Sequence, residues 1–197
     1  MSDALVFPGQ GSQSQGMQAD LAAEFAEVRE TWEEASSVLG FDLWAIVADG
    51  PAEKIGETLR TDGFEVDVVS VKDSPTPSNY EAVIVGSGAR AGGWHGPAKK
   101  WVSKNASALK DMPVAFFTTC LTMESEPDKA DEVRAYTDKL LAETGIEPFD
   151  YGLFAGWFMP DEFGFVERTI LEKMNAVPGD FRDWDAIIEW TTQAEAG

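Results

Sequence analysis

The chain has 197 residues, a length at which one domain can bury a core without disulfides or metal ions. Its 35 acidic and 15 basic residues give a formal net charge of −20, which argues against binding to nucleic acid or to anionic membrane surfaces. The single cysteine, Cys120, excludes an internal disulfide framework and a cysteine metal cluster, and this favours a cytoplasmic location.

The first residues form no signal-peptide pattern, and no run of about 18 apolar residues occurs, so we expect no integral membrane segment.

The first predicted element is a short apolar strand at residues 4–7, which ends at Pro8. A loop of glycine, serine and glutamine follows it before a helix, and such a loop can bind an anion through its backbone N–H groups. The candidate anion-binding residues are Gly9, Gly11, Ser12, Gln13 and Ser14.

Helices and strands alternate along the rest of the chain. Apolar residues recur at spacings of three and four between positions 21 and 39 and predict a helix that ends at Gly40. Further helices are expected at about 52–60, 97–109, 129–143 and 184–193, and strands at about 64–71, 82–85, 114–117 and 151–155. This alternation predicts a mostly parallel sheet with helices on both faces and ligands beyond the carboxyl ends of the strands.

The segment from Val85 to His95 is rich in glycine and follows a buried strand. Its sequence GSGARA formally matches the dinucleotide fingerprint, with Asp111 about twenty residues further on, but the glycines are spread over a long loop and no helix starts at once. Such a loop suits the close approach of backbone to a flat aromatic ring, with Trp94 free to stack and Arg90 to contact an anionic edge. The alternative is an ordinary glycine-rich connection.

Other catalytic chemistries find little support in the sequence. His95 is the only histidine, neither a nucleophile elbow nor a P-loop motif occurs, and we expect His95 at the surface or at the edge of a ring. The hydroxyls that follow the strand at 114–117, beginning with Thr118 and Thr119, can satisfy the edge of a polar heterocycle. Cys120 is expected to be a buried structural thiol.

A cluster of carboxylates lies near the C-terminus, at Asp180, Asp183 and Asp185. Their spacing is typical of the start of a helix rather than of a metal cage, because carboxylates stabilise a helix N-terminus. We therefore expect capping residues here and no metal site.

Residues from about 54 to the C-terminus resemble the flavodoxin-domain proteins of the menaquinone-dependent protoporphyrinogen dehydrogenase type. The matching stretches are GETLRTDGFEVDVVSVKD, YEAVIVGSGARAGGWH, PVAFFTTCLT, YGLFAGWF and GDFRDWDAI. The resemblance implies a flavodoxin-like three-layer α/β/α sandwich, FMN as cofactor, and a redox partner protein or a quinone as partner. The residues that it places around the isoalloxazine ring are Ser87, Gly88, Ala89, Arg90, Ala91, Gly92, Gly93 and Trp94, then Thr118, Thr119, Cys120 and Leu121, with Tyr151 and Gly152 close to it.

The first 53 residues resemble a different family. The stretches ALVFPGQGSQSQGM and EASSVLGFDLWAIVADGPAE are similar to the start of malonyl-CoA:acyl-carrier-protein transacylase. In that family the glutamine that matches Gln10 helps form the oxyanion site, whereas the serine nucleophile and its histidine lie far downstream. Because this chain contains neither, we expect no acyltransferase activity.

The two resemblances meet near residue 53, and they leave two hypotheses open. We expect residues 1–53 and 54–197 to fold as one unit, with residues 4–7 as the central strand of the flavodoxin order 2-1-3-4-5. The first hypothesis is an FMN-binding redox protein, in which the glycine loop at residues 9–14 replaces the family's own phosphate loop. The alternative is a chimeric flavodoxin-like scaffold that has lost the phosphate loop, binds no cofactor and is not an enzyme. The substrate and the oligomeric state stay open.

Overall fold

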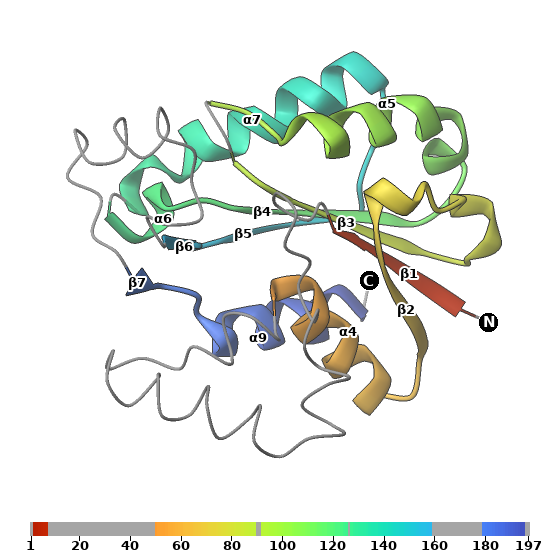
Figure 1. Cartoon of the computed structure of the whole chain (residues 1–197), viewed down its shortest axis with the longest axis horizontal. Coiled ribbons are helices and arrows are strands. Elements are labelled where there is room, and N and C mark those ends of the chain that lie inside the picture. Colours follow the sequence, from red (N-terminus) through yellow and green to blue (C-terminus); the bar gives the residue numbers. More distant parts are fainter. Residues whose placement is uncertain (1, 8–49, 90–91, 126, 159–178, 196–197) are drawn as a thin grey trace.

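The structure is a computed structural model that describes residues 2–7, 50–89, 92–125, 127–158 and 179–195 (Figure 1). Its centre is a five-stranded sheet in the order β2-β1-β3-β4-β5, with every neighbouring pair parallel. The strands are β1 (Ser2–Phe7), β2 (Glu65–Ser70), β3 (Val83–Gly88), β4 (Val114–Thr119) and β5 (Asp150–Phe154). This is the predicted flavodoxin-like arrangement, and it confirms the fold class.

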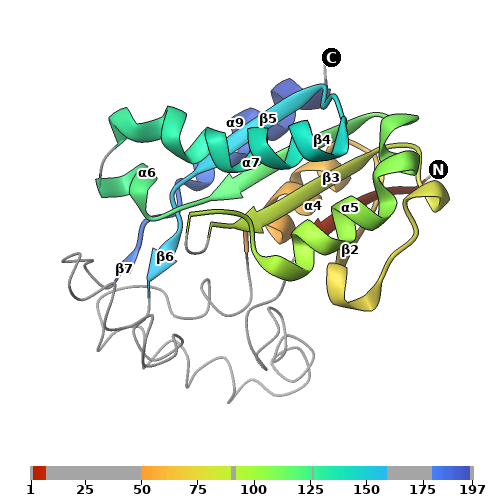
Figure 2. The same ribbon diagram turned by 90° about the horizontal axis from the view of Figure 1, so that it is seen from above.

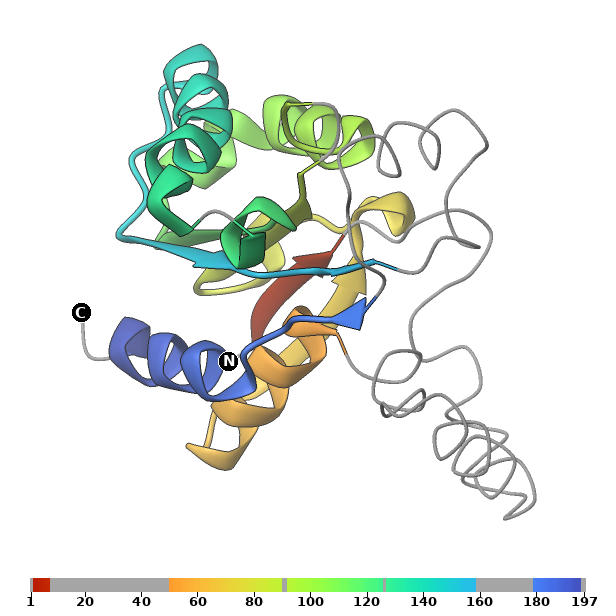
Figure 3. The ribbon, with the colours of Figure 1, turned by 90° about the vertical axis from the view of Figure 1, so that its left-hand side faces the viewer.

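Helices cover both faces of the sheet and complete the three layers (Figures 1 and 3). On one face lie α4 (Pro51–Thr61) and α9 (Trp184–Glu195), and on the other lie α5 (Gly96–Lys110) and α7 (Ala130–Thr144). The shorter elements are η1 (Val71–Asp73), η2 (Pro77–Asn79), α6 (Thr122–Ser125), η3 (Pro127–Lys129) and the antiparallel pair of β6 (Trp157–Phe158) with β7 (Gly179–Asp180). In the described part of the chain, no helix combines the length and apolarity that crossing a membrane requires.

Two central strands carry apolar residues on both sides, as a sheet covered on both faces requires. In β3, Val83 and Val85 pack in the core beneath α5 and α7, whereas Ile84 packs in the core beneath α4 and α9. In β4, Phe116 and Phe117 divide in the same way, because successive side chains point to opposite faces of a strand. The continuous apolar runs of the sequence therefore become the two cores of the sandwich.

The strand β1 lies inside the sheet between β2 and β3, the place predicted for it. The backbone of β1 pairs with β2 from Ser2 to Phe7 and with β3 from Ala4 to Val6. It therefore fills the place between Val66 and Val83 that the flavodoxin order leaves for a first strand. The helix expected at 21–39 and the glycine loop at 9–14 lie outside the described residues.

Candidate functional site

The loops that follow β3, β4 and β5 lie side by side at the carboxyl edge of the sheet, the place where open α/β sheets bind ligands (Figure 2). The backbone N–H of Ala89 donates to the carbonyl of Thr119 across 2.8 Å, which joins the first two loops. The N–H of Cys120 donates to the carbonyl of Phe154 across 2.9 Å, which joins the second to the end of β5. The three loops that the sequence analysis selected for a ligand search therefore form one surface at this edge.

The described residues 88–89 and 92–95, here called the glycine hairpin, lie at the end of β3 and before α5. Ala89 and Trp94 form an antiparallel bridge, and the N–H of His95 donates to Ser87 Oγ across 3.1 Å. Arg90 and Ala91 lie outside the described residues. Gly92 adopts a φ of +76°, which favours glycine, and a Cβ built on Gly92 or Gly93 would meet no atom of the described residues within 4 Å. The hairpin thus presents bare backbone with open space beside it, which fits a flat ring.

Trp94 does not extend from the hairpin as an exposed stacking residue. Its side chain is only 6% exposed and lies in the core beneath α5 and α7, with its ring centroid 5.4 Å from that of Phe116. Its indole N–H donates to Thr118 Oγ1 at 2.9 Å and to Thr137 Oγ1 at 2.8 Å. The expectation that Trp94 is free to stack on a ligand is therefore corrected, because burial and two buried acceptors hold the ring inside the protein.

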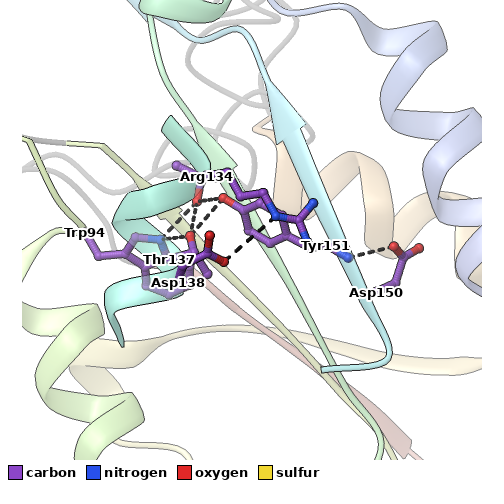
Figure 4. A network of polar contacts seen from close by, with 7 residues as sticks. Trp94, Arg134, Thr137, Asp138, Asp150 and Tyr151 are labelled. Carbon is purple, nitrogen blue, oxygen red and sulfur yellow. Dashed lines mark hydrogen bonds and ion pairs between the residues drawn. The ribbon is translucent and has the colours of Figure 1, made fainter. Parts of the chain in front are cut away.

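Thr118 Oγ1, Thr137 Oγ1 and the Tyr151 hydroxyl contact one another in a set here called the hydroxyl triangle (Figure 4). Both threonines are fully buried, and Tyr151 is partly buried. The three oxygen-oxygen distances are 3.0 Å, 2.8 Å and 2.9 Å. Each hydroxyl offers one proton and can accept at least one, so the triangle can close with every proton used inside it. The expectation that the Thr118 hydroxyl faces a ligand is therefore corrected, because this hydroxyl bonds inside the protein. In the closed triangle no hydroxyl proton is left to donate to a ligand.

Thr137 is the member of this group that the sequence analysis missed. The buried residues of α7 are Val133, Thr137, Leu140 and Thr144, which recur at spacings of three and four on one face of the helix. Two threonines on such an otherwise apolar face are a signal of internal hydrogen bonding, because a buried hydroxyl needs a partner. The partners of Thr137 come from three other segments, and the sequence pattern alone does not name them.

Tyr151 and Gly152 lie in the body of the sheet and not in the loops at its edge. They pair with Phe116 and Phe117, whereas β4 continues to Thr119. A Cβ on Gly152 would lie 2.8 Å from Phe154 and 3.0 Å from Trp190, so this position faces the core beneath α4 and α9. Gly152 therefore faces the core, whereas the Tyr151 hydroxyl reaches toward the end of β4, where it donates to Thr118.

The loop after β4 contributes mainly backbone to the edge. The carbonyl of Thr119 accepts from the hairpin, and those of Cys120 and Leu121 accept from the N–H groups of Met123 and Glu124 at 3.1 Å and 3.0 Å. The Cys120 thiol is free and only partly buried, in contrast to the buried thiol that we expected. Among the described residues, no group of three histidine, cysteine or carboxylate side chains could hold a metal ion.

Of the three carboxylates predicted to cap a helix near the C-terminus, Asp183 does so and Asp180 does not. Asp183 Oδ1 accepts from the N–H of Ala186 across 2.9 Å, which caps α9 as predicted. Asp180 instead binds the guanidinium of Arg182 through two contacts of 2.8 Å and 2.7 Å, and the Arg182 side chain is fully buried over the ring of Trp184. The capping expectation is therefore wrong for Asp180, because a buried cation nearby takes both of its oxygens.

Burial raises the pKa of the Tyr151 phenol above its ordinary value of 10.0, and Asp138 adds to the rise. The hydrogen bonds that the phenol makes with Thr118 and Thr137 lower the pKa, as does the charge of Arg134, whose guanidinium lies 5.3 Å from the ring centroid, but they do not reverse the rise. The folded protein therefore holds this proton more tightly than the unfolded chain does.

Stability is expected to depend on pH through Tyr151 above about pH 10. A pKa that is raised in the folded state adds to the free energy of unfolding. This contribution is fully present below the pKa of the unfolded chain and is lost as the pH rises through the pKa of the folded protein. Urea unfolding of the wild type and of Tyr151→Phe between pH 8 and pH 11 measures this effect. The stability advantage of the wild type should narrow above pH 10, whereas a constant difference would show that the phenol titrates as it does in the unfolded chain.

Comparison with known proteins places the chain in a family. A sequence profile described as "Flavodoxin domain" matches residues 51–185, which is more than half of the chain. The protoporphyrinogen IX dehydrogenase (quinone) of Escherichia coli (strain K12) is 24% identical over 160 residues, covering 74% of this chain and 88% of that protein. The malonyl CoA-acyl carrier protein transacylase of the same strain is 57% identical over 58 residues, or 29% of this chain, and the chain spans 19% of that protein's length.

Solved structures agree on the fold. Oxidised flavodoxin 1 from Bacillus cereus has a TM-score of 0.53 and 13% identity, covering 100% of this chain and 98% of that chain. Oxidised flavodoxin 2 from the same species has a TM-score of 0.50 at 13% identity, covering 100% and 99%. With its strand order and the profile match over residues 51–185, the chain belongs to the flavodoxin-domain family, whose members bind FMN.

Proposed function

We propose that the chain is an FMN-dependent oxidoreductase or electron-transfer protein that holds the isoalloxazine ring between the glycine hairpin and the loop after β4. The observation that carries this proposal is the hairpin itself, where Gly92 and Gly93 present backbone beside open space at the carboxyl edge of a flavodoxin sheet. When bound, FMN supplies the redox chemistry, and the protein supplies its orientation and electrostatic surroundings.

The residues that we propose around the ring divide into two groups. Backbone of Gly88, Ala89, Gly92 and Gly93 would contact it from the hairpin, and backbone of Thr119, Cys120 and Leu121 from the loop after β4. Ser87, Trp94, Thr118 and Tyr151 would act from inside the protein by holding these loops in place. The proposed phosphate contacts are Gly9, Gly11, Ser12, Gln13 and Ser14, which, like Arg90 and Ala91, lie outside the described residues and stay a prediction.

We further propose that the electron partner is a redox protein or a quinone. A relative named for a quinone supports the second possibility, and the net charge of −20 would steer a basic protein partner toward the chain. A cytoplasmic location and a reaction of the protoporphyrinogen-dehydrogenase type belong to the same proposal. The pairing of β1 with both β2 and β3 supports residues 1–53 and 54–197 as one folding unit.

Titration of the FMN-free protein with FMN and with riboflavin tests the cofactor proposal. We expect one FMN per chain, and weaker binding of riboflavin, which lacks the phosphate. Replacing Ser12 and Ser14 together by alanine should weaken FMN binding at least about tenfold, because each hydrogen bond to a charged group is worth about 1.5–3 kcal/mol, and should leave riboflavin binding nearly unchanged. Flavin fluorescence measures each dissociation constant.

The same titration distinguishes the second hypothesis, a scaffold without a cofactor. That hypothesis is favoured by the transacylase match, which extends over 58 residues of this chain. A folded protein that takes up neither FMN nor riboflavin would support it and contradict the proposal. Equal loss of FMN and riboflavin in the double variant would show that the two serines do not bind the phosphate.

A further inference from the structure

We propose that Thr137, which lies on α7 and outside both loops, is a positioning residue that fixes the glycine hairpin against the ring of FMN. The inference rests on the proposed function, since it concerns how the same site is shaped. Thr137 belongs to helix α7 and not to a loop at the carboxyl edge of the sheet. It acts through Trp94, whose indole N–H it accepts at 2.8 Å.

Trp94 is the link because it forms the base of the hairpin. Its backbone pairs with Ala89, so the position of its ring determines where the returning strand of the hairpin runs. The next residue, His95, donates its N–H to Ser87 and precedes the first residue of α5. A shift of the indole would therefore move the bare backbone of Gly92 and Gly93, which is the surface proposed for the ring.

The proton count explains why a hydroxyl is needed at residue 137. Tyr151 donates to Thr118, so the triangle closes when Thr118 donates to Thr137 and Thr137 donates back to Tyr151. Both threonines also accept from the Trp94 indole. If residue 137 becomes apolar, the Thr118 hydroxyl loses the acceptor of its proton within the triangle, and the Trp94 indole keeps only one of its two acceptors. A buried donor without an acceptor lowers the stability of the folded state.

Helix α7 offers a matched control at Thr144. Thr144 is buried on the same face, seven residues further along, but its hydroxyl donates to Leu140 within its own helix across 2.7 Å. Thr137→Val and Thr144→Val each exchange a hydroxyl for a methyl group at nearly constant shape and keep the β-branch in the helix. They differ in whether the lost hydroxyl reaches the hairpin.

The first measurement uses amide and indole hydrogen exchange in the FMN-free protein. In Thr137→Val, the indole N–H of Trp94 and the amides of Ala89 and His95 should exchange at least about tenfold faster, which corresponds to about 1.4 kcal/mol of local protection. Thr144→Val should change these rates less than about twofold, and Thr137→Ser, which keeps the hydroxyl, should restore them. Unchanged rates in Thr137→Val, or equal acceleration in both valine variants, would overturn the proposal.

The second measurement is the FMN dissociation constant, which should rise about tenfold in Thr137→Val and stay within about twofold in Thr144→Val. Equal FMN affinity of Thr137→Val and wild type would overturn the positioning role. If the wild type binds no FMN, the proposed function fails, and the exchange rates alone decide whether Thr137 fixes the hairpin.

If Thr137→Val does not fold, Trp94→Phe removes the same hydrogen bond from the side of the indole. It should speed exchange of the same two amides, and unchanged rates there would also overturn the proposal.

Discussion

Replacing Trp94 by alanine is expected to lower the free energy of unfolding of the FMN-free protein by about 3–5 kcal/mol, the usual cost of truncating a buried tryptophan. The ring is 6% exposed and packs on Phe116, so its removal leaves a cavity beneath α5 and α7. It also removes the donor that Thr118 and Thr137 share. Urea unfolding of the FMN-free variant measures the change.

Trp94→Phe is the matched control for this prediction. Phenylalanine keeps most of the packing against Phe116 and loses only the indole N–H, so we expect a loss of about 1 kcal/mol. A residue that only stacked on a ligand would behave differently, because its truncation would weaken FMN binding and leave the FMN-free protein as stable as before. Unchanged stability of Trp94→Ala would therefore reinstate the stacking role that the sequence favoured.

The fold could be predicted from sequence because it depends on local patterns and on a topological rule. Apolar runs such as residues 114–117, separated by helices, predict a parallel sheet covered on both faces. Only one place in such a sheet was left for the apolar run at residues 4–7, and β1 occupies it. In contrast, β6 and β7 have two residues each, which is too short for any periodicity to reveal.

The site could be located from sequence, but the orientation of its side chains could not. A tryptophan beside glycines fits an exposed stacking residue and a core anchor equally well. What decides for Trp94 is a pair of acceptors that lie 24 and 43 positions away in the chain, at Thr118 and Thr137. Such distant partners leave no trace in a local motif.

Asp183 and Asp180, near α9, show the same difference between a local contact, which the sequence predicts, and a role set by the tertiary structure, which it does not. The bond from Ala186 to Asp183 spans three residues within one helix turn, and propensity rules describe it. Asp180 instead pairs with Arg182, whose buried guanidinium lies over the ring of Trp184 and needs an anionic partner. Burial of a charge is a property of the tertiary structure, so the sequence spacing alone suggested the wrong role.

The glycine pattern GSG has a structural explanation that differs from the dinucleotide motif. Gly86 belongs to β3 and lies directly opposite Phe117 of β4. A Cβ at residue 86 would overlap the ring of Phe117, so the position needs glycine for space and not for an unusual φ. Gly86 therefore serves the packing of the core beneath α4 and α9.

Gly86→Ala is accordingly expected to lower the free energy of unfolding by about 3 kcal/mol, the upper part of the usual range for overpacking a core. The Phe117 ring is fully buried, and its centroid lies 6.0 Å from that of Phe154 and 6.3 Å from that of Trp190, so it has little room to move aside. Gly96→Ala is the control, since a Cβ there meets no atom of the described part of the chain within 4 Å, and its effect on the free energy of unfolding should stay within about 0.5 kcal/mol.

A double-mutant cycle with Phe117→Leu identifies the cause of that loss. Leucine lacks the ring atoms that the new Cβ would meet, so the two substitutions together should cost at least about 1 kcal/mol less than the sum of their separate effects. Urea unfolding of the four proteins in the cycle gives this coupling energy. Additive losses, or a Gly86→Ala protein as stable as Gly96→Ala, would show that the strand accommodates a methyl group without moving Phe117, and that the close approach of the ring does not explain the glycine.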